Sequence, residues 1–108
     1  MSSSTNAKDV AILTALADPI RLEIVKRLRK TREVAGVDLA TRLGISRALL
    51  CHHAGILVSA SVATRRKAGQ TGYLRLNTVH LRRCLGKLAT PRRARKRQAT
   101  RSRVRAKP

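Results

Sequence analysis

The chain has 108 residues, enough for one domain of ordinary size. Its formal net charge is +20, from 25 basic and only five acidic residues, so the expected partner is a polyanion. Phe and Trp are absent and Tyr73 is the single aromatic residue, which disfavours a protein that stacks single-stranded bases and favours duplex DNA. So few acids, with no nucleophile-His-acid arrangement and no phosphate-cradling Gly loop, also disfavour an enzyme.

The first helix is expected over residues 8–17, because Val10, Leu13 and Leu16 recur at helical spacing. Residues 1–7, MSSSTNA, are small and polar, and we expect them to form a disordered lead-in. The apolar stripe of this short helix needs a partner surface.

A second helix is expected after Asp18 and Pro19, since Asp is a good N-cap and Pro at the first helical position loses no hydrogen bond. Most of its remaining positions are basic and are interpreted as a solvated face. Its apolar face is predicted to comprise Leu22, Ile24, Val25 and Leu28.

Residues 37–43 predict a third helix that stops at Gly44, a residue type that tolerates left-handed backbone. Ile45 is expected to return to the core, and Ser46 to cap a fourth helix that runs to about Val58. Two short helices joined by such a turn form a helix-turn-helix, whose second helix enters the major groove.

The segments SVATRR and TGYLRLN alternate apolar and polar residues around the turn sequence KAGQTG, and they predict a β-hairpin, or wing. A last helix is expected over residues 78–88, with an apolar side made by Leu81, Cys84, Leu85 and Leu88.

The folded domain is therefore expected over residues 8–90. Residues 91–108 carry nine basic groups and no acid, so we expect a disordered polybasic tail that binds phosphates. The sequence has no signal-peptide pattern and no long uncharged apolar run, and its two cysteines lie far apart. We expect a cytoplasmic, nucleoid-associated protein with reduced thiols and no membrane span.

The succession of LADPIRLEIVKRL, DLATRLGIS, a His-His pair and RRKAGQTGYLRLN resembles the ArsR/SmtB family of winged-helix repressors over residues 12–88. This resemblance implies a mainly α fold of five helices with a small β-hairpin wing. It also implies a homodimer, paired through residues 10–17 and 79–88, that binds an inverted-repeat operator and releases it in response to a signal.

The resemblance places the base-contacting positions on the outer face of the fourth helix. Arg47 is the strongest of them, because an Arg at a helix N-terminus can bond two acceptors of guanine, whereas Ser46 caps the helix or bonds a phosphate. On the wing, four cations are expected to contact phosphates or the minor groove. The expected DNA-binding residues are Ser46, Arg47, Ala48, Cys51, His52, Arg65, Arg66, Lys67 and Arg75.

The family's usual metal ligands are missing, so no metal or cofactor is expected and the inducer stays unidentified. Ala35 and Val37 occupy the positions of a cysteine pair, and His80 is the only ligand kept of four on the last helix. Cys51, His52 and His53 cannot converge on one ion, because neighbouring helical residues point about 100° apart. A site completed across a dimer stays open as an alternative.

His53 falls where winged helices often keep a structural His against the wing, and we expect that role here. Cys51 and Cys84 are either thiol sensors or small residues, with Cys84 in the dimer seam and Cys51 facing the groove. Gly55 inside the reading helix is expected to soften it, and Ser61 stands where a Gly before the wing is usual.

The leading hypothesis is a sequence-specific, homodimeric transcriptional repressor of double-stranded DNA. One alternative is a sequence-tolerant architectural protein that coats DNA through its wing and basic tail. A further alternative is a sensor that responds to thiol reagents or metals through Cys51 or Cys84. The ratio of operator affinity to random-duplex affinity distinguishes the first two.

Overall fold

The computed structural model describes residues 3–91 of the chain. This part contains five helices and a three-stranded antiparallel sheet with strand order β1-β3-β2, so the expected mainly α fold with a wing is confirmed. The elements are α1 (Ser3–Leu16), α2 (Pro19–Lys30), β1 (Val34–Ala35), α3 (Gly36–Leu43), α4 (Arg47–Ser59), β2 (Ala63–Ala68), β3 (Thr71–Leu76) and α5 (Thr78–Ala89).

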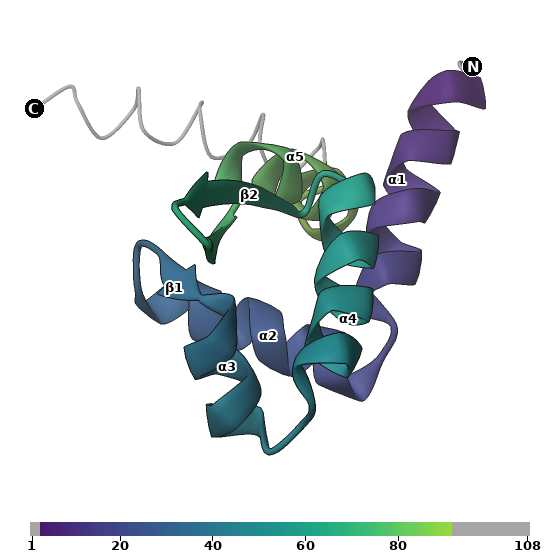
Figure 1. Cartoon of the computed structure of the whole chain (residues 1–108). Coiled ribbons are helices and arrows are strands. Elements are labelled where there is room, and N and C mark those ends of the chain that lie inside the picture. The colour runs from purple at the N-terminus through teal and green to yellow at the C-terminus, as the bar shows by residue number, and fades with distance from the viewer. Residues whose placement is uncertain (1–2, 92–108) are drawn as a thin grey trace, which may run out of the picture.

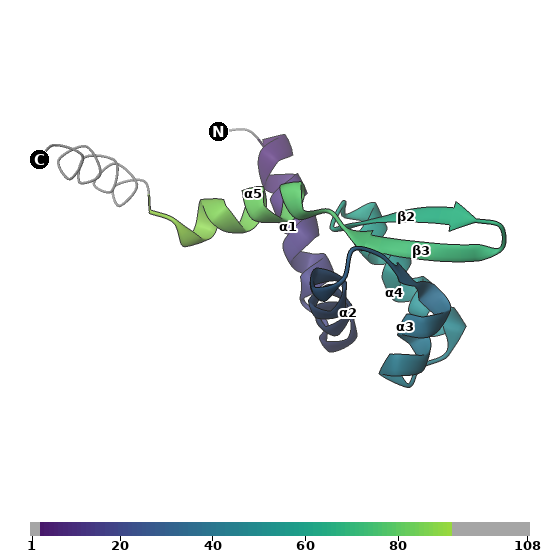
Figure 2. The same ribbon diagram turned by 90° about the vertical axis from the view of Figure 1, so that its left-hand side faces the viewer.

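The hairpin of β2 and β3 projects away from the helices (Figure 2), whereas α5 extends from the opposite end of the molecule. Helices α3 and α4 lie below the hairpin in that view, and α1 crosses beside the start of α5. In Figure 1 the same arrangement places α4 between α1 and the wing strands. The wing and helices α3 and α4 therefore lie at one end of the molecule, and α1 and α5 lie at the other.

Helix α1 begins at Ser3, so the boundary predicted at Lys8 is wrong and the lead-in prediction fails for residues 3–7. The cause is that apolar periodicity detects only the turns of a helix that pack. Ile12 and Ala15 supply the buried face of α1, whereas Val10 is 59% exposed. The apolar stripe that the sequence predicted on this helix is thus largely exposed in a single chain.

Helix α2 starts as predicted: the Asp18 carboxylate accepts a hydrogen bond from the Arg21 amide at 3.0 Å, and Pro19 is the first helical residue. The helix buries Ile24, Val25 and Leu28. Leu22 is exposed, which corrects its assignment to the apolar face. At about 100° per residue it lies roughly a third of a turn away from the buried three.

The sheet contains one strand more than the sequence predicted, because β1 has only two residues and no pattern to detect. Val34 of β1 pairs with Leu74, and Ala35 pairs with Tyr73. Before β2, Ser61 adopts a left-handed conformation with φ of 63°, so a residue with a Cβ stands at a position that favours Gly.

The wing turns at Gly69 and Gln70, and Gly69 supplies the positive φ of 62° that the first central residue of a type II′ turn needs. Helix α5 ends at Ala89, before Pro91, as predicted. The predicted polybasic tail beyond Pro91 lies outside the described residues. None of the helices that the structure describes is both long and apolar enough to cross a membrane.

Candidate nucleic-acid interface

The predicted helix-turn-helix is confirmed in α3 and α4. Gly44 ends α3 in a left-handed conformation with φ of 68°, and its amide donates to Thr41 at 3.1 Å. The Ile45 amide then donates to the Ala40 carbonyl at 3.1 Å, while the Ile45 side chain packs against the core. This closed turn fixes the direction in which α4 leaves α3.

Ser46 caps α4 as predicted, since its hydroxyl oxygen accepts a hydrogen bond from the Leu49 amide at 3.0 Å. The inner face of the helix is buried through Leu50, Ala54 and Leu57. All five positions inferred for α4 are exposed, namely Ser46, Arg47, Ala48, Cys51 and His52.

A groove of about 380 Å³ separates the start of α4 from the wing. Arg47 and Cys51 line it from the helix, and Arg65 lines it from β2. Gly36, at the start of α3, and Leu50 of α4 also line it. An Arg of the reading helix and an Arg of the wing therefore meet at one hollow, although 18 positions separate them in the sequence.

The two faces of the wing divide the four predicted wing cations. Arg65 pairs with Leu74, whose side chain is buried under the helices, and Arg66 pairs with Tyr73. Because side chains alternate along a strand, Lys67 shares the face of Arg65. Arg75 shares the face of Arg66. The structure therefore brings two of the four cations to the side of α4, and directs the other two to the opposite side.

Arg66 is tied to the protein rather than free for phosphate. Its Nη2 and Nε donate to the two carboxylate oxygens of Glu33 at 2.7 and 3.0 Å, and its guanidinium lies 4.8 Å from the centre of the Tyr73 ring. The hydrogen bond from Arg66 holds the pKa of Glu33 below its ordinary value. The sequence expectation of a phosphate contact did not foresee this partner, which comes from the segment before β1.

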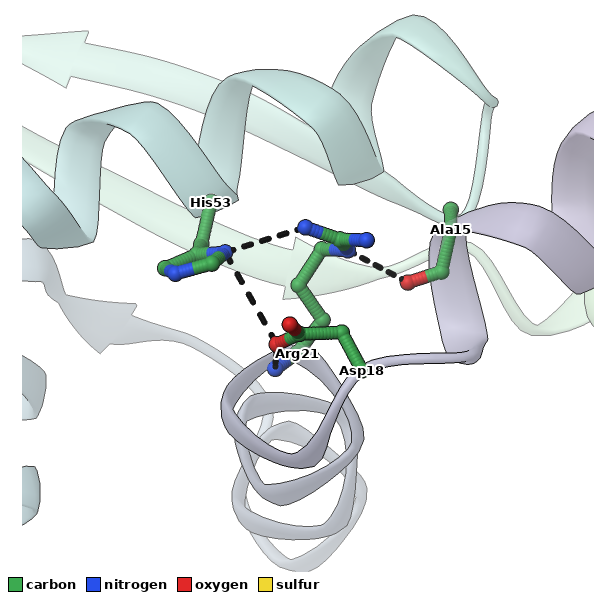
Figure 3. Close-up of polar contacts among 4 residues, drawn as sticks. All are labelled: Ala15, Asp18, Arg21 and His53. Atoms are coloured by element: carbon green, nitrogen blue, oxygen red, sulfur yellow. Dashed lines mark hydrogen bonds and ion pairs between the residues drawn. The ribbon is translucent and has the colours of Figure 1, made fainter.

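His53 has the structural role expected of it, but not at the predicted place. It is the one buried polar residue in the described part of the chain, and its polar partners are Arg21 and Asp18, at the junction of α1 and α2, rather than residues of the wing. Figure 3 shows its ring beside the guanidinium of Arg21, with 3.1 Å between His53 Nδ1 and Arg21 Nη1. The Asp18 carboxylate is 3.8 Å from the same nitrogen.

The two cysteines occupy unlike environments. Cys51 is exposed beside the groove, whereas Cys84 is 2% exposed. The sulfur of Cys84 faces the Asp9 carbonyl of α1 at 4.0 Å, so it belongs to the core of a single chain and not to the expected dimer seam. Burial raises the pKa of the Cys84 thiol, which disfavours a reactive thiolate there. Among residues 3–91 no group of three His, Cys, Asp or Glu residues is placed to hold a metal ion.

The fold and the exposed face of α4 define a winged helix-turn-helix domain of the kind found in DNA-binding transcriptional regulators, and comparisons with known proteins support this class. The transcriptional repressor SdpR of Bacillus subtilis is 36% identical over 70 residues, which cover 65% of this chain and 77% of SdpR. Comparison with the profiles of protein families gives no match.

Among solved structures, an ArsR-like transcriptional regulator from Rhodococcus sp. RHA1 superposes with a TM-score of 0.71 and 25% identity, covering 95% of this chain and 92% of the other. The homodimeric winged helix-turn-helix DNA-binding domain of Mb0332 from Mycobacterium bovis has a TM-score of 0.69 at 23% identity, covering 77% of each chain. The chain belongs to the ArsR/SmtB family of transcriptional regulators.

Proposed function

We propose that this protein is a sequence-specific repressor that binds an inverted-repeat operator as a homodimer. The observation that carries the proposal is the convergence of Arg47 and Arg65 on one groove between the reading helix and the wing. A base-reading group and a phosphate-binding group thereby face the same side, as a duplex laid along α4 requires.

The base-reading role is assigned to the exposed first turns of α4. Arg47 is the first residue of the helix and is exposed, so it can extend to guanine without leaving an acid partner behind. Ala48, Cys51 and His52 follow on the exposed side, and Ser46 is committed to capping, so its contact would be to a phosphate.

The phosphate-binding role is assigned first to Arg65 and Lys67, which share the wing face that looks toward α4. Arg75 lies on the other face and would serve a phosphate only where the duplex passes the edge of the wing. Arg66 is the weakest candidate of the four, because binding DNA would require it to leave Glu33.

The dimer is proposed to form through residues 10–17 and 79–88. Large apolar side chains of α1 and α5 are left exposed in a single chain, which is costly in water and favours burial against a second copy. The working compartment that fits this role is the cytoplasm, on the nucleoid. The exposed apolar residues are Val10, Leu13, Val79, Leu85 and Leu88.

The test is binding to a duplex from upstream of the protein's own gene and to a scrambled duplex of equal length, at about 150 mM salt. We expect a preference of about 1000-fold or more for the upstream duplex. Arg47→Ala should reduce it by about tenfold or more, since a bidentate contact to guanine contributes roughly 1–3 kcal/mol. Arg29→Ala, which removes the same charge from an exposed position of α2 outside the proposed DNA and dimer surfaces, is the matched control.

A second candidate is an architectural protein that coats DNA, favoured by the net charge of +20. It predicts nearly equal affinity for the two duplexes and equal losses in Arg47→Ala and Arg29→Ala. The further alternative is a repressor that also responds to thiol reagents or metals. Of the two cysteines proposed for this role, Cys51 is the better placed, because it is exposed beside the groove whereas Cys84 is buried.

A further inference from the structure

A partly buried polar contact joins the reading helix to the junction of α1 and α2. His53, on the inner side of α4, is 7% exposed, and its Nδ1 lies 3.1 Å from Arg21 Nη1. On its other side, Arg21 donates from Nε to the Ala15 carbonyl at 2.7 Å. Figure 3 shows the guanidinium lying between the His53 ring and this carbonyl. One side chain of α2 thus bonds both α1 and α4.

The chemistry of the contact fixes the state of the imidazole. An Arg guanidinium has only donors and stays charged, so Nδ1 of His53 must be the acceptor. The ring is therefore neutral, with its proton on Nε2. A protonated His53 carries N–H groups on both nitrogens and cannot accept from Arg21.

A protonated His53 ring has a different partner close by, the carboxylate of Asp18. The Asp18 carboxylate is 3.8 Å from His53 Nδ1, too long for a hydrogen bond but close enough for an ion pair. The same carboxylate oxygen accepts from the Arg21 amide at the start of α2. The charged or titratable groups facing His53 are thus Asp18 from the turn, Arg21 from α2, and His52 of α4, whose ring centre lies 5.2 Å away.

We propose that Arg21 is a positioning residue that sets the reading helix against α1, and that it does so only while His53 is neutral. The inference rests on the proposed function, because it concerns how well Arg47 and its neighbours meet the bases. Protonation removes the acceptor, brings two cations together and draws the ring toward Asp18, so α4 loses its polar link to α1 through Arg21 and keeps only its apolar packing there.

The consequence is that acid weakens operator recognition more than it weakens binding to random duplex. Recognition requires α4 at a defined depth in the groove, whereas random binding needs only positive charge. We expect the ratio of the two affinities to fall about tenfold between about pH 7.8 and about pH 5.8, the range in which histidine side chains of proteins commonly change charge.

The experiment measures the full chain against the upstream and scrambled duplexes at both pH values and fixed salt. His53→Gln keeps an acceptor for Arg21 but cannot take a proton, so its ratio should stay constant. The His53→Gln variant keeps His52 and His80, so a constant ratio in it also shows that these two histidines do not cause the fall. Lys26→Gln, at an exposed position of α2 outside the proposed DNA and dimer surfaces, is the control for the substitution, and its ratio should fall like that of the native chain. Arg21→Met should show a low ratio at both pH values, and Arg21→Lys should restore part of it.

Nitrogen-15 NMR of the free protein supplies a readout that needs no DNA. We expect His53 to carry its proton on Nε2 at the higher pH, and the amides of α4 to shift on acidification in the native chain but not in His53→Gln. Circular dichroism checks that each variant is folded.

The proposal is overturned if the His53→Gln ratio falls as far as the native one, or if Arg21→Met keeps the native ratio. A proton on Nδ1 at the higher pH would also overturn it. Equal affinity of the native chain for both duplexes at the higher pH would instead contradict the proposed function. The NMR titration would then test by itself whether protonation of His53 changes the position of α4.

Discussion

Arg66 of β2 and Glu33, the residue before β1, form a two-point ion pair with distances of 2.7 and 3.0 Å. The pair crosses the outer face of the sheet over Tyr73, so it fastens the wing strands to the segment between α2 and α3. One cation expected to serve DNA is thereby assigned to holding the wing.

Glu33→Gln should loosen the wing, because the carboxylate is the only acid that contacts Arg66 among the described residues. The lowered pKa of Glu33 means that the folded state favours its charged form, so the stabilisation is full at neutral pH and is lost as the pH falls through that pKa. Hydrogen exchange of the amides that pair β1 with β3 measures the loosening, which should appear as faster exchange in Glu33→Gln. Glu23→Gln, which breaks the ion pair with Arg27 on α2, is the control and should leave the wing amides unchanged.

Ser61→Gly should stabilise the protein by about 0.5–1 kcal/mol, because a left-handed backbone is strained for a residue with a Cβ and costs glycine little. Urea unfolding gives the free-energy difference. Ser59→Gly, at the end of α4, is the matched control and should destabilise the chain by a similar amount. A destabilised Ser61→Gly variant would contradict the assignment of strain.

Gly55→Ala should raise the free energy of unfolding by about 1 kcal/mol, since Ala is the better helix former and an added Cβ meets no atom within 4 Å. Gly44→Ala should lower it, because Gly44 has φ of 68° although its surroundings are equally open. Thermal unfolding of both variants shows whether the backbone conformation of the glycine or the space around it determines the effect of an added Cβ. Equal effects of the two substitutions would refute the distinction.

N-ethylmaleimide should label one cysteine in the folded protein and two in urea, since Cys51 is exposed and Cys84 is buried with a raised thiol pKa. The adduct on Cys51 should reduce binding to the upstream duplex, because it occupies the groove beside Arg47. Mass spectrometry counts the adducts. Cys51→Ser should bind DNA and lose the sensitivity, and unchanged binding by the labelled native chain would remove Cys51 from the interface.

Leu88→Gln should weaken self-association, because this α5 side chain is 67% exposed in one chain and lies in the proposed dimer surface. Leu22→Gln is the control: Leu22 is 42% exposed but lies on α2, outside that surface. Sedimentation velocity over a range of concentrations distinguishes monomer from dimer. A dimer lost equally in both variants would place the interface elsewhere.

Much of the reading helix was predictable because its signals are local. Ser46 lies three positions before the amide it caps, and Gly44 ends α3 through its own backbone angle. The features that the sequence did not predict correctly, the start of α1 and the strand β1, have no local signal. The first turn of α1 has no apolar period, and β1 is two residues long.

The candidate site was only half predictable. The exposed positions of α4 follow from helical periodicity once its buried face is known. Which wing cations share its side depends on the register of β2 against β3, and a shift of one residue would have reversed the assignment of Arg65 and Arg66.

The sequence by itself determined the five helices, the turn before the reading helix, the wing and the basic character, because these depend on neighbours within a few positions and on composition. Only the tertiary structure decided the partners of Arg66, His53 and Cys84. Their contacts join residues 33, 32 and 75 positions apart, and such contacts depend on how the elements pack rather than on any short pattern.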